Sequence, residues 1–266
     1  MTLKLTPIVH GELCNGVRWE VEDIDLLAES VARVAMGQYR HVSKILEGLA
    51  GEPPRSSQQH ANDAKLKLEL AADGSPWHRD GWIFQVLSWM AALQQQGKNT
   101  VSQAPHIYKA HKGFDGIQLE LADDQKTVKA IVIFEDKATD NPRDTIRDEV
   151  WPDIVDLEQG KRVGELTSEA TTLLALNQIR FPNMDVDQAI DTIIWQEMRR
   201  YRVSITTSAT HSSDKARMRL FDGFDVKALG DRSRRTGETM HFDDLRVWMA
   251  EFVDLVAKKI DEVANV

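Results

Sequence analysis

Three ionisable residues at the open end of one predicted β-hairpin have the types and spacing for metal-dependent chemistry. The stretch GFDGIQLELADDQKTVKAIVIFEDKAT, residues 113–139, contains two apolar runs on either side of a polar turn. Folding the stretch about this turn places Asp115 beside Glu135 at the end of the sheet. Glu135 and Lys137 are two positions apart, so both side chains project from the same face of their strand.

Two carboxylates that lie side by side repel each other unless a divalent cation or a shared proton offsets the charge. Carboxylate oxygens are hard ligands and suit Mg²⁺ or Mn²⁺. A lysine beside them can orient or deprotonate a water molecule, or stabilise charge on a phosphate. In the ordinary alternative, Glu135 and Lys137 form a solvent-facing pair at a strand end, and Asp115 is a turn residue.

The second strand favours the chemical interpretation, because VKAIVIF is the continuous apolar run of a strand covered on both faces. Asp136 points to the opposite face from Glu135 and is expected to hold a helix or loop there. A helix over residues 80–96 precedes the hairpin, which spans residues 115–121 and 128–137. Gln85 lies on an apolar stripe of this helix and therefore needs a polar partner.

The remaining segments predict an α/β protein in one domain. Proline 152 should kink or break the helix that contains it. Apolar periodicity and composition predict further helices at 21–49, 139–160, 165–177, 185–198 and 242–263, and strands at 62–75, 200–210 and 216–226.

An aspartate on one strand followed by Glu-x-Lys on the next resembles the PD-(D/E)XK, or restriction-endonuclease-like, nuclease superfamily. Here the matching residues are Asp115 in GFDG and Glu135 and Lys137 in FEDK. The resemblance implies a mixed central sheet of about four or more strands flanked by helices. It divides the chain into a helical N-terminal extension (1–75), a nuclease-like core (76–210) and a C-terminal extension (211–266) that ends in a long helix.

The resemblance also implies an activity, that of a Mg²⁺-dependent (or Mn²⁺-dependent) endodeoxyribonuclease. Asp115 and Glu135 would hold the metal, Lys137 would assist the attacking water, and Gln85 would complete the metal's ligands. Similar cores occur in restriction enzymes and in effector nucleases of bacterial anti-phage defence, which suggests a role in antiviral defence. Phe114 stands where many members have proline, and Gln85 is a weaker ligand than glutamate, so the number of metal ions stays open.

The net charge of −9 argues against a protein that binds phosphate backbones over much of its surface. We therefore expect a protein partner or a homo-oligomer to supply part of the recognition or activation. The densest basic stretch is GDRSRRTG, in which Arg232, Arg234 and Arg235 either contact nucleic acid or form a solvated loop.

A single cysteine, Cys14, excludes an internal disulfide and fits a reducing cytoplasm. No basic leader or long apolar window is evident, so we expect no membrane association. Two alternatives to the enzyme remain open. One is a non-catalytic interaction subunit built on a nuclease-like scaffold within a defence complex, and the other is an unrelated α/β protein whose hairpin imitates the motif.

Overall fold

A mixed sheet runs through the middle of the protein in a computed structural model that describes residues 2–49, 51–106, 113–193 and 195–264. The seven strands have the order β1-β2-β7-β6-β5-β4-β3. They are β1 (Leu3–His10), β2 (Cys14–Val21), β3 (Thr100–Ser102), β4 (Gly116–Leu121), β5 (Val128–Lys137), β6 (Arg199–Thr207) and β7 (Arg235–His241). The predicted α/β class with a mixed sheet is confirmed.

Strands β2, β7, β6 and β5 are parallel. At the two sides of this group, β1 pairs antiparallel with β2 and β4 pairs antiparallel with β5, and β3 pairs antiparallel with β4 at the edge. Strand β5 lies between β4 and β6 and is buried along almost its whole length, as its continuous apolar run predicts. The strand that carries Glu135 and Lys137 is therefore a rigid inner strand of the sheet.

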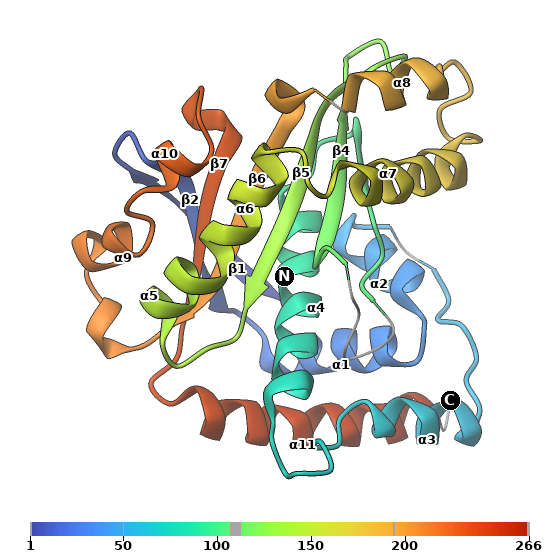
Figure 1. Cartoon of the computed structure of the whole chain (residues 1–266). Helices are drawn as coiled ribbons and strands as arrows, with labels where there is room; N and C mark the ends of the chain where they lie inside the picture. Colours follow the sequence, from blue (N-terminus) through green and yellow to red (C-terminus); the bar gives the residue numbers. More distant parts are fainter. Residues whose placement is uncertain (1, 50, 107–112, 194, 265–266) are drawn as a thin grey trace.

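One face of the sheet is covered by helices from both ends of the chain (Figure 1). These helices are α1 (Ile24–Ala35), α2 (Tyr39–Leu46), α3 (Gln58–Leu66), α4 (Trp77–Gln95) and α11 (Leu245–Ala264). Helix α4 is apolar on most sides because it packs against the sheet as well as against α1 and α2. It confirms the helix predicted over residues 80–96.

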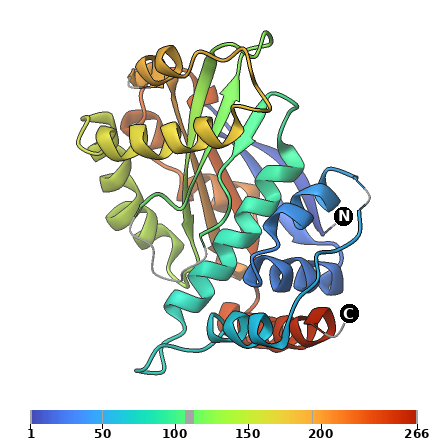
Figure 2. The ribbon, with the colours of Figure 1, turned by 90° about the vertical axis from the view of Figure 1, so that its right-hand side faces the viewer.

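The opposite face is covered by the helices between β5 and β7, so that the sheet lies between two helical layers (Figure 2). They are α5 (Pro142–Thr145), a π-helical turn (Ile146–Val150), α6 (Trp151–Glu158), α7 (Val163–Asn177), α8 (Val186–Ile193), α9 (Asp214–Leu220) and α10 (Phe224–Lys227). Pro152 does not break the helix, since the wider π-helical turn directly before it accommodates the missing backbone donor.

The prediction of a helical N-terminal extension is wrong for its first part. Residues 3–21 form the β1–β2 hairpin, and β2 joins the central sheet by pairing parallel with β7. The single helix predicted over residues 21–49 is two helices, because Gly37 between them has φ of 79°. The sheet therefore extends well beyond the predicted core.

Two predicted strands are helical. The alternating leucines within 62–75 belong to the end of α3 and the turns after it. The segment 216–226 contributes to α9 and α10, which are separated by Gly223 with φ of 88°. Alternation over so few residues does not distinguish a strand from a short helix. The helix expected at 185–198 begins as α8, and residue 194 lies outside the described residues.

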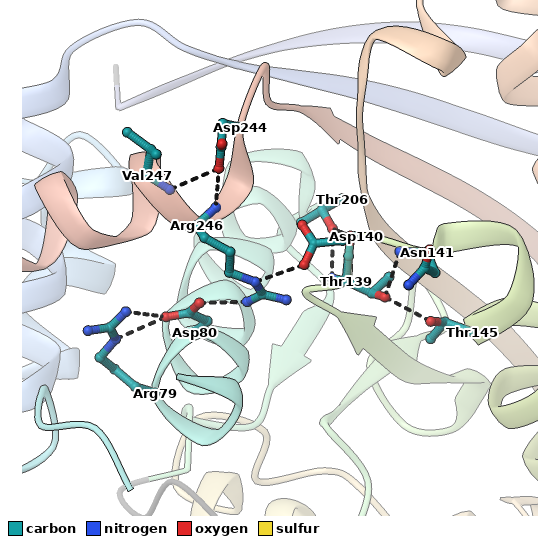
Figure 3. A network of polar contacts seen from close by, with 10 residues as sticks. All are labelled: Arg79, Asp80, Thr139, Asp140, Asn141, Thr145, Thr206, Asp244, Arg246 and Val247. Carbon is teal, nitrogen blue, oxygen red and sulfur yellow. Dashed lines mark hydrogen bonds and ion pairs between the residues drawn. The ribbon is translucent and has the colours of Figure 1, made fainter. Parts of the chain in front are cut away.

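The first turn of α11 is tied to α4 and to the segment that leaves β5 (Figure 3). Arg246 donates from Nη1 to Asp80 of α4 at 2.6 Å and from Nε to Asp140 at 2.9 Å. The backbone amide of Thr139 donates to the hydroxyl of Thr206 on β6 at 2.8 Å. The chain that follows Lys137 is thus fixed directly to α11 and β6, and through Arg246 it is linked to α4. Within the described residues, no helix combines the length and the apolar composition that crossing a bilayer requires.

Candidate active site

The β4–β5 hairpin brings Asp115 and Glu135 to the same end of the sheet. Gly116 pairs with Phe134, so Asp115, one residue earlier, falls opposite Glu135. The Asp115 carboxylate also accepts a 2.7 Å hydrogen bond at Oδ2 from the backbone amide of Asp136. The predicted juxtaposition of the two strand ends is confirmed.

Gln85 of α4 reaches the same carboxylate from the helical layer. Its Nε2 donates to Oδ1 of Asp115 at 2.5 Å. Asp115 is therefore the polar partner that the position of Gln85 on an apolar stripe required. Both oxygens of Asp115 accept hydrogen bonds, one from α4 and one from β5, which fixes the orientation of this carboxylate.

Lys137 completes the group on the face of β5 that Glu135 occupies. Its Nζ lies 3.7 Å from Oε2 of Glu135 and 3.9 Å from Oε2 of Glu149 in the π-helical turn. The side chain of Glu135 is 5% exposed, whereas that of Lys137 is 24% exposed. The ammonium group therefore lies where buried acidic groups meet solvent. All four predicted site residues, Gln85 included, are brought together.

Burial makes the two carboxyl groups unusually weak acids, and the charge of Asp115 adds to this effect at Glu135. Burial raises the pKa of Asp115, although Lys137 opposes the change. Burial, followed by the nearby Asp115 carboxylate, raises the pKa of Glu135 to about 8. Burial lowers the pKa of Lys137, but Glu135 and Asp115 outweigh this effect and raise it overall. The ammonium ion is thus held in its charged form beside carboxylates that gain from a further positive charge.

The donor set fits a hard divalent cation. Two carboxylates and the amide oxygen of Gln85 are oxygen ligands, and a cation would relieve the repulsion that raises the pKa of Glu135. The described part of the chain contains no group of three or more His, Cys, Asp or Glu side chains that could hold a metal ion. Asp115 and Glu135 would therefore bind the ion together with Gln85 or water, as Mg²⁺ often binds.

Sequence reasoning missed three charged residues around this group, Glu149, Asp153 and Arg162. Glu149 contacts Lys137, and Asp153 of α6 acts on both Glu135 and Lys137 through its charge. Arg162 directly precedes α7 and acts on Glu135 in the same way. In the sequence these residues resemble the solvated charges of any helix surface, so no local signal distinguished them.

Asp136 faces the opposite side of β5, as predicted, and joins a buried polar network under α4. Its Oδ1 accepts a 2.6 Å hydrogen bond from the hydroxyl of Ser88. Arg202 of β6 donates to that hydroxyl at 2.7 Å and pairs with Glu238 of β7 at 2.5 Å. This network joins the helix that carries Gln85 to the strand that carries Glu135.

The arginines of the stretch 230–237 do not form a basic surface. Arg234 is buried and pairs with Glu158 at 2.7 Å, and Arg235 is buried and donates to backbone carbonyls, including that of Ala228 at 2.8 Å. Burial therefore removes these two residues from the predicted contact with nucleic acid. Arg232 is more exposed and donates to the carbonyl of Gly11 at 3.1 Å.

Comparison with known proteins provides no further assignment. A scan against protein-family models finds no match, and a search of curated proteins finds none either. Interpretation of the site therefore depends on its geometry and chemistry.

Proposed function

We propose that the protein is a metal-dependent nuclease that hydrolyses phosphodiester bonds, with DNA as its substrate. The convergence of Asp115, Glu135 and Lys137 at the end of the β4–β5 hairpin is the observation that supports this proposal most directly. It combines the buried carboxylate of Glu135 and the half-buried carboxylate of Asp115, which suit a divalent cation, with one cation suited to a phosphate.

The arrangement of the surrounding elements also supports a restriction-endonuclease-like core. Strand β4 pairs antiparallel with β5, and β5 pairs parallel with β6. Helix α4, which supplies Gln85, precedes the hairpin and packs against β5. The resemblance implies this order of a helix, a hairpin and, after a further helix, another strand.

Each residue of the site has a role in this reaction. Hydrolysis forms a bond from a water oxygen to phosphorus and breaks one P–O ester bond; one water proton passes to the leaving oxygen. A bound Mg²⁺ would supply Lewis acidity toward the phosphate and the water. Asp115 and Glu135 would hold the ion, and Gln85 would orient Asp115. Lys137 would orient the attacking water and stabilise negative charge on the phosphate.

The charge of the chain bears on its substrate affinity. With a net charge of −9, the isolated protein would neutralise few phosphates and bind DNA weakly. A protein partner or a second copy would then supply additional contacts. We place this activity in antiviral defence, following the resemblance to defence nucleases.

The test is cleavage of plasmid, linear and single-stranded DNA, and of RNA, in Mg²⁺ or Mn²⁺. Wild-type protein should cleave DNA, and Glu135→Ala and Lys137→Ala should each reduce the rate by about a hundredfold or more. Lys129→Ala is the matched control, since Lys129 is an exposed lysine on the same strand and away from the site. Equal cleavage by wild type and both site variants would reject the site.

A binding measurement separates the enzyme from a non-catalytic scaffold. Calorimetric titration of the wild-type protein with Mg²⁺ or Mn²⁺ should show binding that Glu135→Ala weakens. Wild-type protein that binds neither ion and cleaves no substrate would favour the interaction subunit instead.

A further inference from the structure

Arg162 has a fixed position beside the candidate active site. Its guanidinium carbon lies 4.3 Å from the centroid of the Phe114 ring. Phe114 immediately precedes Asp115 and is only 1% exposed. A planar guanidinium that stacks on a buried ring has a defined orientation and retains its edges for hydrogen bonding.

The electrostatic surroundings of Arg162 place it at the same group of carboxylates. Besides its own partner Glu165, the carboxylates of Glu135 and Asp153 raise the pKa of Arg162. Among the described residues, Arg162 forms an ion pair with Glu165 and none with Glu135. Its charge therefore acts on the candidate metal ligand Glu135 without direct pairing.

Two nitrogens of the Arg162 guanidinium are hydrogen-bonded, and the third remains available to a ligand. Nε and Nη2 donate to the two carboxylate oxygens of Glu165 at 2.9 and 3.0 Å. Nη1 makes no hydrogen bond to any residue in the described ranges. The side chain is 25% exposed, so solvent or a ligand can reach it. The two hydrogen bonds to Glu165 thus fix the orientation of the Arg162 guanidinium, as a hydrogen-bond partner behind a binding group commonly does.

A phosphate that enters this site meets a strongly acidic environment. The carboxylates of Asp115, Glu135 and Asp153 lie in it, together with Glu149. Lys137 is already close to both Glu135 and Glu149. A second protein cation would offset the repulsion between these groups and a phosphodiester, and arginine is suited to phosphate because its planar fork donates two parallel hydrogen bonds.

We infer that Arg162 is a further catalytic residue that binds the scissile phosphate of the substrate from the α7 side of the site, whereas Lys137 acts from β5. This inference rests on the proposed nuclease function. Arg162 donates hydrogen bonds and keeps its proton throughout. Its contribution should be largest when negative charge on the phosphate oxygens is greatest, in the transition state.

The test compares Arg162→Ala with Lys161→Ala. Lys161 is the adjacent residue, carries the same charge and pairs with Asp156 on the surface. In Mg²⁺ and with saturating DNA, Arg162→Ala should lower kcat by about a hundredfold or more, and Lys161→Ala should stay within about twofold. Arg162→Lys should restore only part of the rate, because lysine lacks the planar fork.

Chemical rescue provides a readout that a purely structural role would not change. Added guanidinium ion should raise the rate of Arg162→Ala, whereas Glu135→Ala should not respond. Equal kcat for Arg162→Ala and wild type, or equal losses for Arg162→Ala and Lys161→Ala, would overturn the inference and leave the nuclease intact. Wild-type protein without nuclease activity would overturn the proposed function, and this inference with it.

Discussion

Gln85 donates a 2.5 Å hydrogen bond to Asp115 across the boundary between α4 and the sheet. Gln85 is therefore part of the candidate site, but it contributes a neutral amide where an acidic residue would contribute charge. We expect this difference to change the affinity of the proposed metal site measurably.

The first prediction concerns Gln85→Glu, which places a third carboxylate next to Asp115. Without metal the variant should be less stable than wild type by about 1 to 3 kcal/mol, because a donor is replaced by a repelling group. Saturating Mg²⁺ should narrow or reverse this difference, since an added carboxylate strengthens cation binding. Thermal denaturation with and without Mg²⁺ measures both effects. Gln85→Ala is the control and should show no such gain, and an identical Mg²⁺ response in both variants would contradict the prediction.

The second prediction concerns pH and the buried Glu135. Its folded-state pKa of about 8 lies above the ordinary glutamate value of 4.5, so folding favours the protonated form. Stability is therefore greatest below about pH 4.5 with respect to this group and decreases as pH rises toward 8, by at most about 1.4 kcal/mol per pH unit. Denaturation of metal-free protein in urea at several pH values measures this slope.

Glu135→Gln isolates the contribution of this one group, because glutamine cannot titrate. The variant should gain stability relative to wild type as pH rises from 5 to 8. Parallel profiles for the two proteins would show that the pKa of Glu135 is not raised.

The third prediction concerns Arg246, which pairs with the fully buried Asp80 and the half-exposed Asp140. Arg246→Ala should lower the free energy of unfolding by about 3 kcal/mol. The buried carboxylate of Asp80 would then pair with Arg79 alone. Asp140→Ala removes an exposed partner and should cost less than about 1 kcal/mol. The free energy of unfolding in urea checks both values. Similar losses for both variants would contradict the assignment of the effect to Asp80.

The hairpin and its carboxylates could be predicted because they depend on local pattern. A polar turn between two apolar runs fixes the register, and the register places Asp115 opposite Glu135. The helix of Gln85 could be predicted from its length and its high apolar content, which are typical of a helix buried on most sides. Here a one-dimensional pattern determines a three-dimensional contact.

The strands β1, β2 and β7 could not be recognised in this way. Strand β7, RTGETMH, has few apolar residues, and its pairing with β2 joins parts of the chain that lie far apart in the sequence. Arg162 and Glu149 were missed for a related reason. Their roles depend on how the helices after β5 pack against the sheet, and the charges alone do not reveal that packing.

The last prediction concerns Ser88, whose hydroxyl donates to Asp136 and accepts from Arg202. Oδ2 of Asp136 is buried and makes no hydrogen bond within the described residues, so this carboxylate depends on few donors. Ser88→Ala should therefore cost about 1 to 3 kcal/mol in urea denaturation, since it leaves a buried acceptor and a buried donor unpaired. Ser168→Ala, at an exposed position of α7, should change stability by less than about 0.5 kcal/mol.

In a double-mutant cycle with Asp136→Asn, the two losses should be less than additive, because both substitutions act on the same hydrogen bond. Strict additivity would mean that Ser88 stabilises α4 without supporting the strand that carries the candidate site.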